Sequence, residues 1–301
     1  MIFRIDKSIT ELNAPDLLVF AGALQKASEN LHFLDVDYQV QLWIERTIFQ
    51  SDLYLGKLVI QQIQRNEEMW SPSSMNRKYL STVTVGCEEG MLTASSMKIM
   101  AEEPSVVVLE NGKYDWCVIS KWIKLYRKDH SFGYVNAYVN RAVGCNLIRS
   151  GNAGGSGGIL NEIDILIPSY KDTYPLKLLS IFDSDKTSPT DIEEHNNTIK
   201  EGLNKLGIEY HELCKREIEN YFPLDTYRRA GFVVAGVDVP DLPEEEWDYL
   251  DVHKNDFLSL EKKDVVTLAK EITKPELQSR VGNVNGQDEI QEIILKLARH
   301  I

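Results

Sequence analysis

Short apolar runs alternate with longer amphipathic segments through the second half of the chain. Residues 105–110, SVVVLE, and residues 176–185, LKLLSIFDSD, contain continuous apolar runs, which predict two strands buried on both faces. Apolar residues at helical spacing predict helices over residues 115–128, 134–148, 159–170 and 190–207. Strands that alternate with helices indicate an α/β fold with a mostly parallel sheet flanked by helices.

The first hundred residues have a weaker pattern. Residues 31–45 mix aliphatic and aromatic positions in partial alternation, which suits a strand and a short helix equally well, and residues 51–68 have apolar positions near helical spacing. Pro104 disfavours a helix immediately before it and marks a boundary. We therefore expect an α+β N-terminal region of unassigned function over residues 1–103, and one domain with a C-terminal helical extension over residues 104–301.

The composition of the 301 residues, with 43% hydrophobic and 26% charged, is that of a globular protein with a sizeable core. A formal net charge of −13 argues against a broad basic surface for nucleic acid, although it allows a local basic groove or an acidic site that binds divalent metal. The four cysteines form no CxxC pair, which argues against a zinc site or a disulfide framework. The chain shows neither a signal segment nor an apolar run of ~18 residues, so we expect a cytoplasmic protein with no membrane partner.

Both predicted strands end in acidic residues. Glu110 closes the first strand, and Asp183 and Asp185 close the second, where they share a face if the strand continues through them. The carboxyl ends of parallel strands form the ligand crevice of such a sheet, and carboxylates held together repel unless a cation lies between them. The three residues therefore predict an all-oxygen site suited to Mg²⁺ or Mn²⁺, with solvated polar strand ends or a turn tip as the alternative.

The order of four motifs resembles the TOPRIM domain of OLD-family (overcoming lysogenization defect) nucleases and related anti-phage defence effectors: VVVLENGKYDW, GGSGG, IFDSD and KREIENYF. The resemblance covers about residues 104–230 and implies a TOPRIM-like sheet. No GxxxxGK(S/T) phosphate loop occurs in the chain, so the ATPase domain of full-length OLD proteins is absent. A separately encoded ATPase, or another defence-system subunit, is therefore an expected partner.

The resemblance assigns metal-binding acids residue by residue. In the family, a strand ends in a catalytic Glu with a further acid close behind, which matches Glu110 and Asp115, although here Asn111 is inserted in the turn. The family's Asp-x-Asp pair after a later strand matches Asp183 and Asp185. The resemblance thus implies that these acids hold the catalytic metal.

The KREIENYF motif adds acids and cations from a later segment. Glu219 is the candidate catalytic ligand of a second metal ion, with Glu217 as its competitor, and the two share a face if residues 208–222 stay extended. Lys215 and Arg216 are candidate cations for the transition state of phosphodiester cleavage. The other candidate cations are Lys113, Lys186, Lys262 and Lys263. A solvated strand edge, or a salt bridge to Lys215 or Arg216, is the alternative for the two glutamates.

Three further segments bear on substrate binding. A glycine cluster can present backbone N–H groups to a phosphate, with a flexible linker as the competing interpretation: Gly154, Gly155, Gly157 and Gly158. Residues 121–130 and 225–232 interleave basic and aromatic residues, which suits contacts with nucleic acid, although solvated helix faces have the same pattern. The acidic residues 238–251 are not expected to face nucleic acid.

The acids and the resemblance together predict a metal-dependent endonuclease that hydrolyses phosphodiester bonds of DNA or RNA with two Mg²⁺ or Mn²⁺ ions. The resemblance further implies an oligomeric anti-phage effector that a separate partner activates. The alternative is a catalytically quiet regulatory or nucleic-acid-binding module that keeps the TOPRIM fold, and the intact acids weigh against it. A primase- or topoisomerase-like enzyme is disfavoured because no attacking tyrosine context is present.

Overall fold

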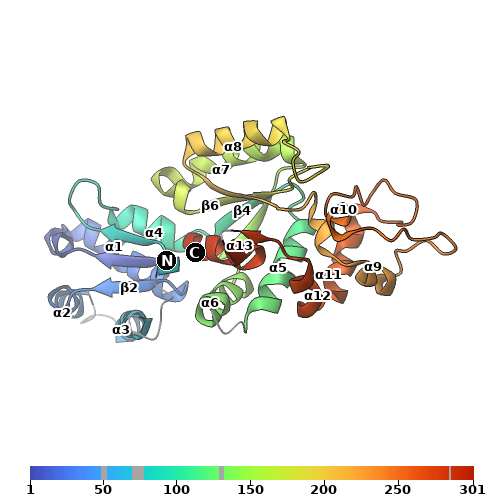
Figure 1. Ribbon diagram of the computed structural model, residues 1–301. Helices are drawn as coiled ribbons and strands as arrows, with labels where there is room; N and C mark the ends of the chain where they lie inside the picture. The colour runs from blue at the N-terminus through green and yellow to red at the C-terminus, as the bar shows by residue number, and fades with distance from the viewer. Residues whose placement is uncertain (49–52, 70–77, 129–131, 285) are drawn as a thin grey trace.

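In the computed structural model, two parallel β-sheets lie next to each other and helices cover their faces (Figure 1). The structure describes the chain except for residues 49–52, 70–77, 129–131 and 285. The end of the basic stretch 121–130 therefore lies outside the described residues. Within the described part, no helix combines the length and the apolar character needed to cross a membrane.

The N-terminal sheet has the strand order β2-β1-β3, and both pairings are parallel. Its elements are β1 (Ile2–Ile5), η1 (Lys7–Glu11), α1 (Ala14–Glu29), β2 (Phe33–Val36), α2 (Tyr38–Thr47), α3 (Leu53–Met69), β3 (Thr82–Val85) and α4 (Ala94–Glu102). The expectation of an α+β region was wrong, because the strands pair in parallel with helices between them. Each strand has only four residues, too few for the sequence pattern to separate parallel from antiparallel pairing.

Residues 31–45 contain both of the elements that their pattern suited. The strand β2 comes first, and α2 begins directly after Asp37, whose side chain accepts a hydrogen bond from the backbone N–H of Gln39 at 2.8 Å. A short acidic cap of this kind satisfies an N–H group that the first helical turn leaves without a partner. The cap therefore marks the point where the strand pattern gives way to the helix.

The second sheet has the strand order β5-β4-β6-β7, again with parallel pairing throughout. Its strands are β4 (Ser105–Leu109), β5 (Ile148–Asn152), β6 (Leu178–Phe182) and β7 (Glu209–Glu212). The two central strands, β4 and β6, are buried along their whole length, which confirms the strands predicted from the two apolar runs. The mostly parallel sheet flanked by helices is likewise confirmed.

The helix predicted over residues 134–148 is shorter than expected and a strand follows it. α6 spans Gly133–Gly144, and Asn146 takes a φ of +57°, a left-handed conformation that cannot continue a helix. After Leu147, residues 148–152, IRSGN, form the edge strand β5. Only Ile148 and Gly151 of β5 are buried and its residues are mostly polar, so neither a continuous apolar run nor a regular alternation indicates it in the sequence.

Helices cover both faces of the second sheet (Figure 1). The predicted helices are present as α5 (Tyr114–Tyr126), α7 (Ile159–Tyr170) and α8 (Glu194–Leu206), and α13 (Glu289–His300) is the last helix. Val106 and Val108 of β4 pack into the core formed with α7 and α8. Val107 and Leu109, which point to the opposite face, pack with α5, α6 and α13. A single strand thus joins two layers of core.

Residues between the sheet and α13 form short elements, of which α11 packs against α5 and α9 packs against α11 (Figure 1). They are α9 (Leu224–Ala230), α10 (Glu244–Asp248), α11 (Val265–Glu271), α12 (Lys274–Arg280), β8 (Asn283–Val284) and β9 (Gln287–Asp288). The remaining 3₁₀ helices are η3 (Ser156–Gly158), η4 (Lys171–Leu176), η5 (Ile218–Tyr221) and η6 (Lys262–Asp264). The first and last residues of the chain lie side by side where the N-terminal sheet meets α13 (Figure 1).

One buried carboxylate fixes the start of α13. Glu289 is fully buried and accepts hydrogen bonds from the backbone N–H of Cys214 at 2.8 Å and from the hydroxyl of Tyr221 at 2.6 Å. Its other contact is the imidazole of His211, with Nε2 2.9 Å from Oε1. Burial acts to raise the pKa of Glu289, but the hydrogen bond and charge of His211 and the other donors more than offset it, so the pKa lies below its usual value.

We expect Glu289→Gln to destabilise the protein by about 2–4 kcal/mol, because a neutral amide cannot satisfy three buried partners of a carboxylate. Urea unfolding measures the change, and Glu201→Gln on the exposed face of α8 is the matched control. A lowered pKa means that the carboxylate stabilises the fold above its ordinary pKa of 4.5 and that this contribution is lost at lower pH. The two unfolding free energies should therefore converge below about pH 4.5. A constant difference down to pH 3 would contradict the proposed role.

Candidate metal centre

Six carboxylates gather at the carboxyl edge of the second sheet, around a cavity of about 60 Å³. These are all of the metal-ligand candidates from the sequence: Glu110, Asp115, Asp183, Asp185, Glu217 and Glu219. The rest of the lining consists of Asn111, Tyr114, His253 and Lys262. The structure therefore brings together every predicted ligand, although metal binding itself stays a prediction.

The pairing of β4 with β6 places the first two acids together. Val108 lies opposite Ser180 in a parallel register, so both strands end at the same edge. The backbone N–H of Asp183 donates a hydrogen bond to Oε1 of Glu110 at 3.1 Å, and Oδ1 of Asp183 accepts one from the backbone N–H of Ile218 at 3.0 Å. Each carboxylate thus uses one oxygen to fix the local backbone.

The Asp-Ser-Asp turn does not continue β6, contrary to our expectation for the pair. Asp185 has a φ of +54°, so Asp183 and Asp185 do not share a face as residues of one strand. The N–H of Asp185 donates to the carbonyl of Arg216 at 3.0 Å, and the hydroxyl of Ser184 donates to the carbonyl of Lys215 at 2.8 Å. These bonds attach the turn to the KREIENYF segment, and both aspartates line the cavity.

Asp115 reaches the cavity from the first turn of α5. Its Oδ2 accepts a hydrogen bond from the backbone N–H of Asn111 at 2.8 Å, so the residue inserted relative to the family pattern is held by the acid itself. Gly112 packs against β5 in the same turn, where a Cβ would lie 2.6 Å from the carbonyl oxygen of Gly151. The turn after β4 is therefore tight, and the insertion does not remove Asp115 from the site.

The negative charges of these acids are not balanced by the residues around the cavity. Burial, followed by the charge of Asp185, raises the pKa of Glu110 to about 7. Burial also raises the pKa of Asp115 and of Glu217 to about 7, and it raises that of Asp183 well above its usual value, with Glu110 as the next cause. Each cause disfavours the charged form, and a divalent cation between the carboxylates would remove the mutual repulsion. The carboxylates themselves offer only oxygen ligands, as Mg²⁺ and Mn²⁺ prefer.

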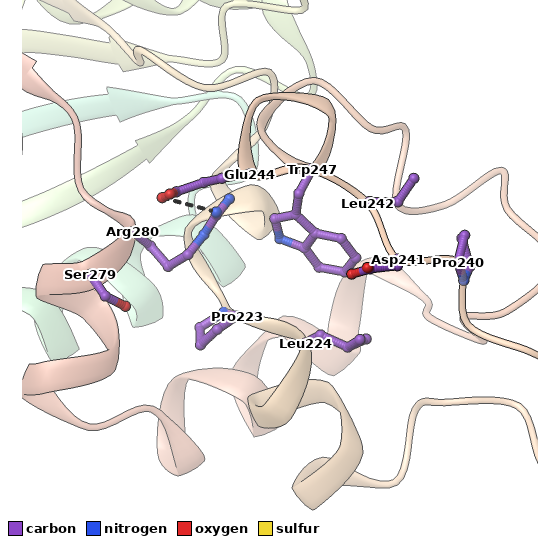
Figure 2. A pocket seen from close by; sticks show the side chains of 9 residues that line it. All are labelled: Pro223, Leu224, Pro240, Asp241, Leu242, Glu244, Trp247, Ser279 and Arg280. Atoms are coloured by element: carbon purple, nitrogen blue, oxygen red, sulfur yellow. Dashed lines mark ion pairs between the residues drawn. The ribbon is translucent and has the colours of Figure 1, made fainter.

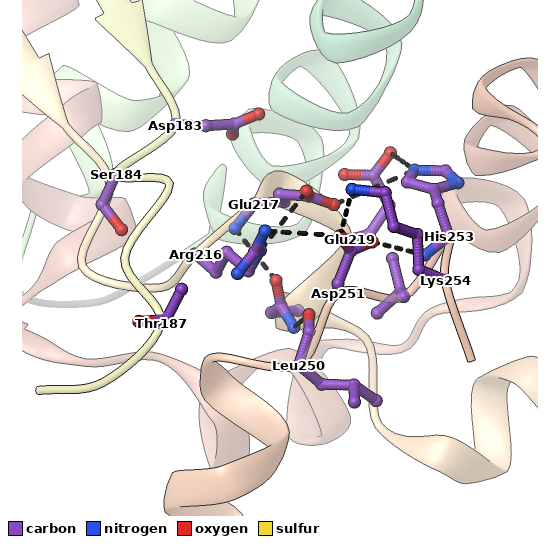
Figure 3. Close-up of polar contacts among 12 residues, drawn as sticks. Asp183, Ser184, Thr187, Arg216, Glu217, Glu219, Leu250, Asp251, His253 and Lys254 are labelled. Carbon is purple, nitrogen blue, oxygen red and sulfur yellow. Dashed lines mark hydrogen bonds and ion pairs between the residues drawn. The ribbon is translucent and has the colours of Figure 1, made fainter. Parts of the chain in front are cut away.

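Residues 208–222 do not stay extended, so the reason for expecting Glu217 and Glu219 on one face was wrong. The chain forms η5, and the backbone N–H of Glu217 donates to Oδ1 of Asn220 at 2.9 Å, which closes the 3₁₀ turn. Both glutamates nevertheless line the cavity, next to the imidazole of His253 (Figure 3). His253 was missed in the sequence because none of the histidines lies in a spaced motif.

The two cations of the KREIENYF motif do not line the cavity. Lys215 is 3% exposed, forms an ion pair with Asp248, and lies over the ring of Tyr221. Arg216 lies behind Glu217, with Nε 3.6 Å from Oε1 of that glutamate. Of the other lysines proposed from the sequence, Lys262 at the start of η6 lines the cavity, whereas Lys113, Lys186 and Lys263 do not.

The glycine cluster shapes the connection from β5 to α7. The N–H of Gly155 donates to the carbonyl of Glu110 at 3.0 Å, and Gly154 and Gly155 have φ values of +72° and +121° that other residues rarely adopt. None of the four glycines, Gly157 included, lines the acidic cavity. A phosphate contact therefore stays a prediction, while the observed role is a tight turn behind Glu110.

A larger cavity of about 370 Å³ lies away from the carboxylates (Figure 2). Its walls include Pro223, Leu224 and Trp247, and the ion pair between Arg280 and Glu244 spans 3.3 Å beside it. It shares no lining residue with the acidic cavity. A cavity of about 490 Å³ beside Tyr249 and Leu250 is larger still. The small cavity nevertheless holds the convergent titratable groups, which are a better indication of chemistry than size.

Gly158→Ala should destabilise the protein by about 1–3 kcal/mol, because the new Cβ would lie 1.9 Å from the carbonyl oxygen of Ala153. Gly157→Ala is the matched control, since a Cβ there meets no atom within 4 Å, and its effect should stay within about 0.5 kcal/mol. Thermal unfolding of the two variants makes the comparison. Equal stability of the two would mean that the turn is a loose linker after all.

Asp183→Asn should raise the stability of the protein without metal by about 1 kcal/mol, because the cavity disfavours a charged carboxylate and the neutral amide keeps an acceptor for the N–H of Ile218. In EDTA this is a rise of roughly 2 °C in Tm. Mn²⁺ at 100 times its Kd should stabilise the wild type by about 2.7 kcal/mol and the variant much less. The control is Asp225→Asn, whose side chain is 72% exposed. An unchanged response of Asp183→Asn to Mn²⁺ would place the metal elsewhere.

No family model, curated protein or solved structure matches the chain. The α/β architecture with mostly parallel sheets is observed, while its identity as a TOPRIM domain stays a prediction. Function is therefore inferred from the site itself.

Proposed function

We propose that the protein is a metal-dependent nuclease of the TOPRIM type, which hydrolyses phosphodiester bonds of DNA or RNA with Mg²⁺ or Mn²⁺. The single observation that carries this proposal is the convergence of six carboxylates on one small cavity at the carboxyl edge of a parallel sheet. Oxygen ligands in this number suit hard divalent cations. Parallel sheets of this kind bind ligands at the carboxyl ends of their strands, which is where these acids lie.

Five of the six acids fall into two groups that could each hold one ion. Glu110, Asp183 and Asp185 come from the ends of β4 and β6, while Glu217 and Glu219 come from η5. Two ions held in this way supply the stabilisation of attacking and leaving oxygens that phosphodiester hydrolysis needs. The two groups lie close enough for charge to act between them, since Glu219 contributes to the raised pKa of Asp183.

Lys262 is the residue that we propose to offset charge on the phosphate. It lines the cavity beside the acids, and its charge lowers the pKa of Glu110 and Asp115 against the larger effect of burial. Its ammonium group can donate hydrogen bonds to phosphate oxygens as negative charge concentrates there. Lys215 and Arg216 act instead as positioning residues, because their ion pairs hold the segment that carries the glutamates.

The first test is nuclease activity on plasmid, linear DNA, single-stranded DNA and total transfer RNA, with Mg²⁺, Mn²⁺ or EDTA. We expect cleavage that requires metal and falls by about 100-fold or more in Glu110→Ala and Asp183→Ala, because each removes a direct ligand. The control is Glu201→Ala on the exposed face of α8, which lies outside the site and should cleave as the wild type does.

Two results would contradict the proposal in different ways. Metal-dependent cleavage that survives both ligand mutations would mean that the site is wrongly placed or that a contaminant cuts. No cleavage by any sample, together with no Mn²⁺ binding by calorimetry, would favour a quiet binding module. Mn²⁺ binding without cleavage, lost in Asp183→Ala, would favour an effector that needs a separately encoded partner such as an ATPase.

A further inference from the structure

We propose that Glu217, Glu219 and His253 form a mixed nitrogen–oxygen metal site, which prefers transition metals such as Mn²⁺ and Zn²⁺ over Mg²⁺. The site differs in ligand chemistry from the all-oxygen group at the ends of β4 and β6. The proposal deepens the proposed nuclease function, because it names the ligand that distinguishes the second ion from the first. Its test measures metal binding and not cleavage.

The distances between the three side chains fit ligands of one ion. Nε2 of His253 lies 3.4 Å from Oε1 of Glu219 and 3.9 Å from Oε2 of Glu217, and the three ligand atoms all lie within 4.8 Å of one another (Figure 3). Ligands bonded at about 2.0–2.2 Å to one tetrahedral ion lie roughly 3.3–3.6 Å apart. A strong charge-assisted hydrogen bond would be shorter, at about 2.7–2.9 Å. The separations are thus closer to those of shared coordination than to those of a tight ion pair.

The imidazole has the orientation that metal-binding histidines usually have. Nδ1 of His253 lies 3.2 Å from the backbone carbonyl of Leu260, to which it can donate its proton. That bond leaves Nε2, which faces the two glutamates, with a lone pair for a metal. A backbone carbonyl that fixes the tautomer of a ligand histidine is a common second contact in metal sites.

The segment that carries His253 is held in place before any ligand binds. Oδ1 of Asp251 accepts a hydrogen bond from the backbone N–H of His253 at 3.2 Å. Asn255 donates to the carbonyl of Val252 at 2.8 Å and accepts from the N–H of Leu258 at 2.8 Å. Val252 and Leu258 are buried on either side of the turn. The ring therefore enters the cavity from an anchored turn, which lowers the entropic cost of forming the site.

One oxygen in the cluster lacks the partner that its burial calls for. Oε2 of Glu217 is buried and has no hydrogen-bond donor, while the neighbouring Arg216 contacts the other oxygen. A buried acceptor without a partner is uncommon because its desolvation is not compensated. A cation among Glu217, Glu219 and His253 would provide that partner.

The ligand chemistry decides which metals the site would favour. Mg²⁺ prefers oxygen ligands and keeps several waters, whereas imidazole nitrogen binds the divalent transition metals more tightly, with affinity rising from Mn²⁺ to Zn²⁺. Two carboxylates and one imidazole are ligand types found in Zn²⁺ and Mn²⁺ sites. The two negative charges of the carboxylates would balance the charge of the divalent ion. The competing arrangement is a protonated His253 that acts only as a counter-ion for the glutamates.

The decisive measurement is electron spin-echo spectroscopy of Mn²⁺ bound to the wild-type protein. We expect modulation from a directly bound ¹⁴N nucleus, and its disappearance in His253→Gln. His195→Gln, on the exposed face of α8, is the matched control and should leave the signal unchanged. In calorimetry His253→Gln should weaken Zn²⁺ binding by about 10-fold or more and leave Mg²⁺ binding unchanged.

Absence of ¹⁴N modulation in the wild type would overturn the proposal without any variant, and so would Zn²⁺ binding that His253→Gln does not weaken. Either result would identify His253 as a counter-ion only. The nuclease function and this site can fail separately. A protein that cleaves nucleic acid but shows no nitrogen coupling contradicts only the mixed site. Nitrogen coupling together with cleavage that survives both Glu110→Ala and Asp183→Ala contradicts only the proposed nuclease site.

Discussion

Parallel pairing of β4 with β6 is the constraint on which the candidate site depends. After β4 the chain forms β5 on one side of it, and then returns to form β6 on the other side. The connections at the carboxyl ends of these strands therefore diverge, which opens a crevice at the point where the direction of winding changes. Glu110 and Asp183, separated by 73 residues, become hydrogen-bonded neighbours only through this pairing. The apolar residues of both strands, packed on two faces, hold the pairing in place.

The protein contains two kinds of buried carboxylate, which differ in their surroundings. One kind stabilises the fold, and the other lies in the candidate site. Glu289 is completely buried, yet three donors converge on it and its pKa lies below the usual value. Asp183 accepts one backbone hydrogen bond and faces other acids, and its pKa lies well above the usual value. The carboxylate of Glu289 thus stabilises the start of α13, whereas the carboxylate of Asp183 is repelled by the acids around it. Repulsion of this kind costs stability in the metal-free chain and is tolerated where a ligand or a reaction requires it.

The elements that could be predicted are those whose buried apolar residues form a regular pattern in the sequence. These are β4, β6 and the amphipathic helices around them. The edge strand β5 and the four-residue N-terminal strands leave none. The turn at η5 could not be distinguished from extended chain, because Asn220 fixes it by donating to the carbonyls of Trp247 and Leu250, far along the sequence. The acids at the strand ends could be predicted because they directly follow the apolar runs that predict β4 and β6. His253 could not, since it follows an irregular segment and reaches the cavity only through tertiary packing. Lys262 was one of several candidate lysines, and only the structure selects it from among them.

The two groups of acids are held in place by different parts of the structure. Glu110 directly follows β4 and is held by the buried sheet, while the turn that carries Asp183 and Asp185 follows β6 and is also hydrogen-bonded to residues 215–218. The group on η5 depends on α10 and the residues around it, because Arg216 donates its N–H to the carbonyl of Asp248 and its guanidinium to Asp251. Arg280 of α12 joins the same network through the carbonyl of Asn220. A displacement of α10 would therefore alter the second group directly. It would reach Asp183 and Asp185 only through their hydrogen bonds to Ile218 and Arg216.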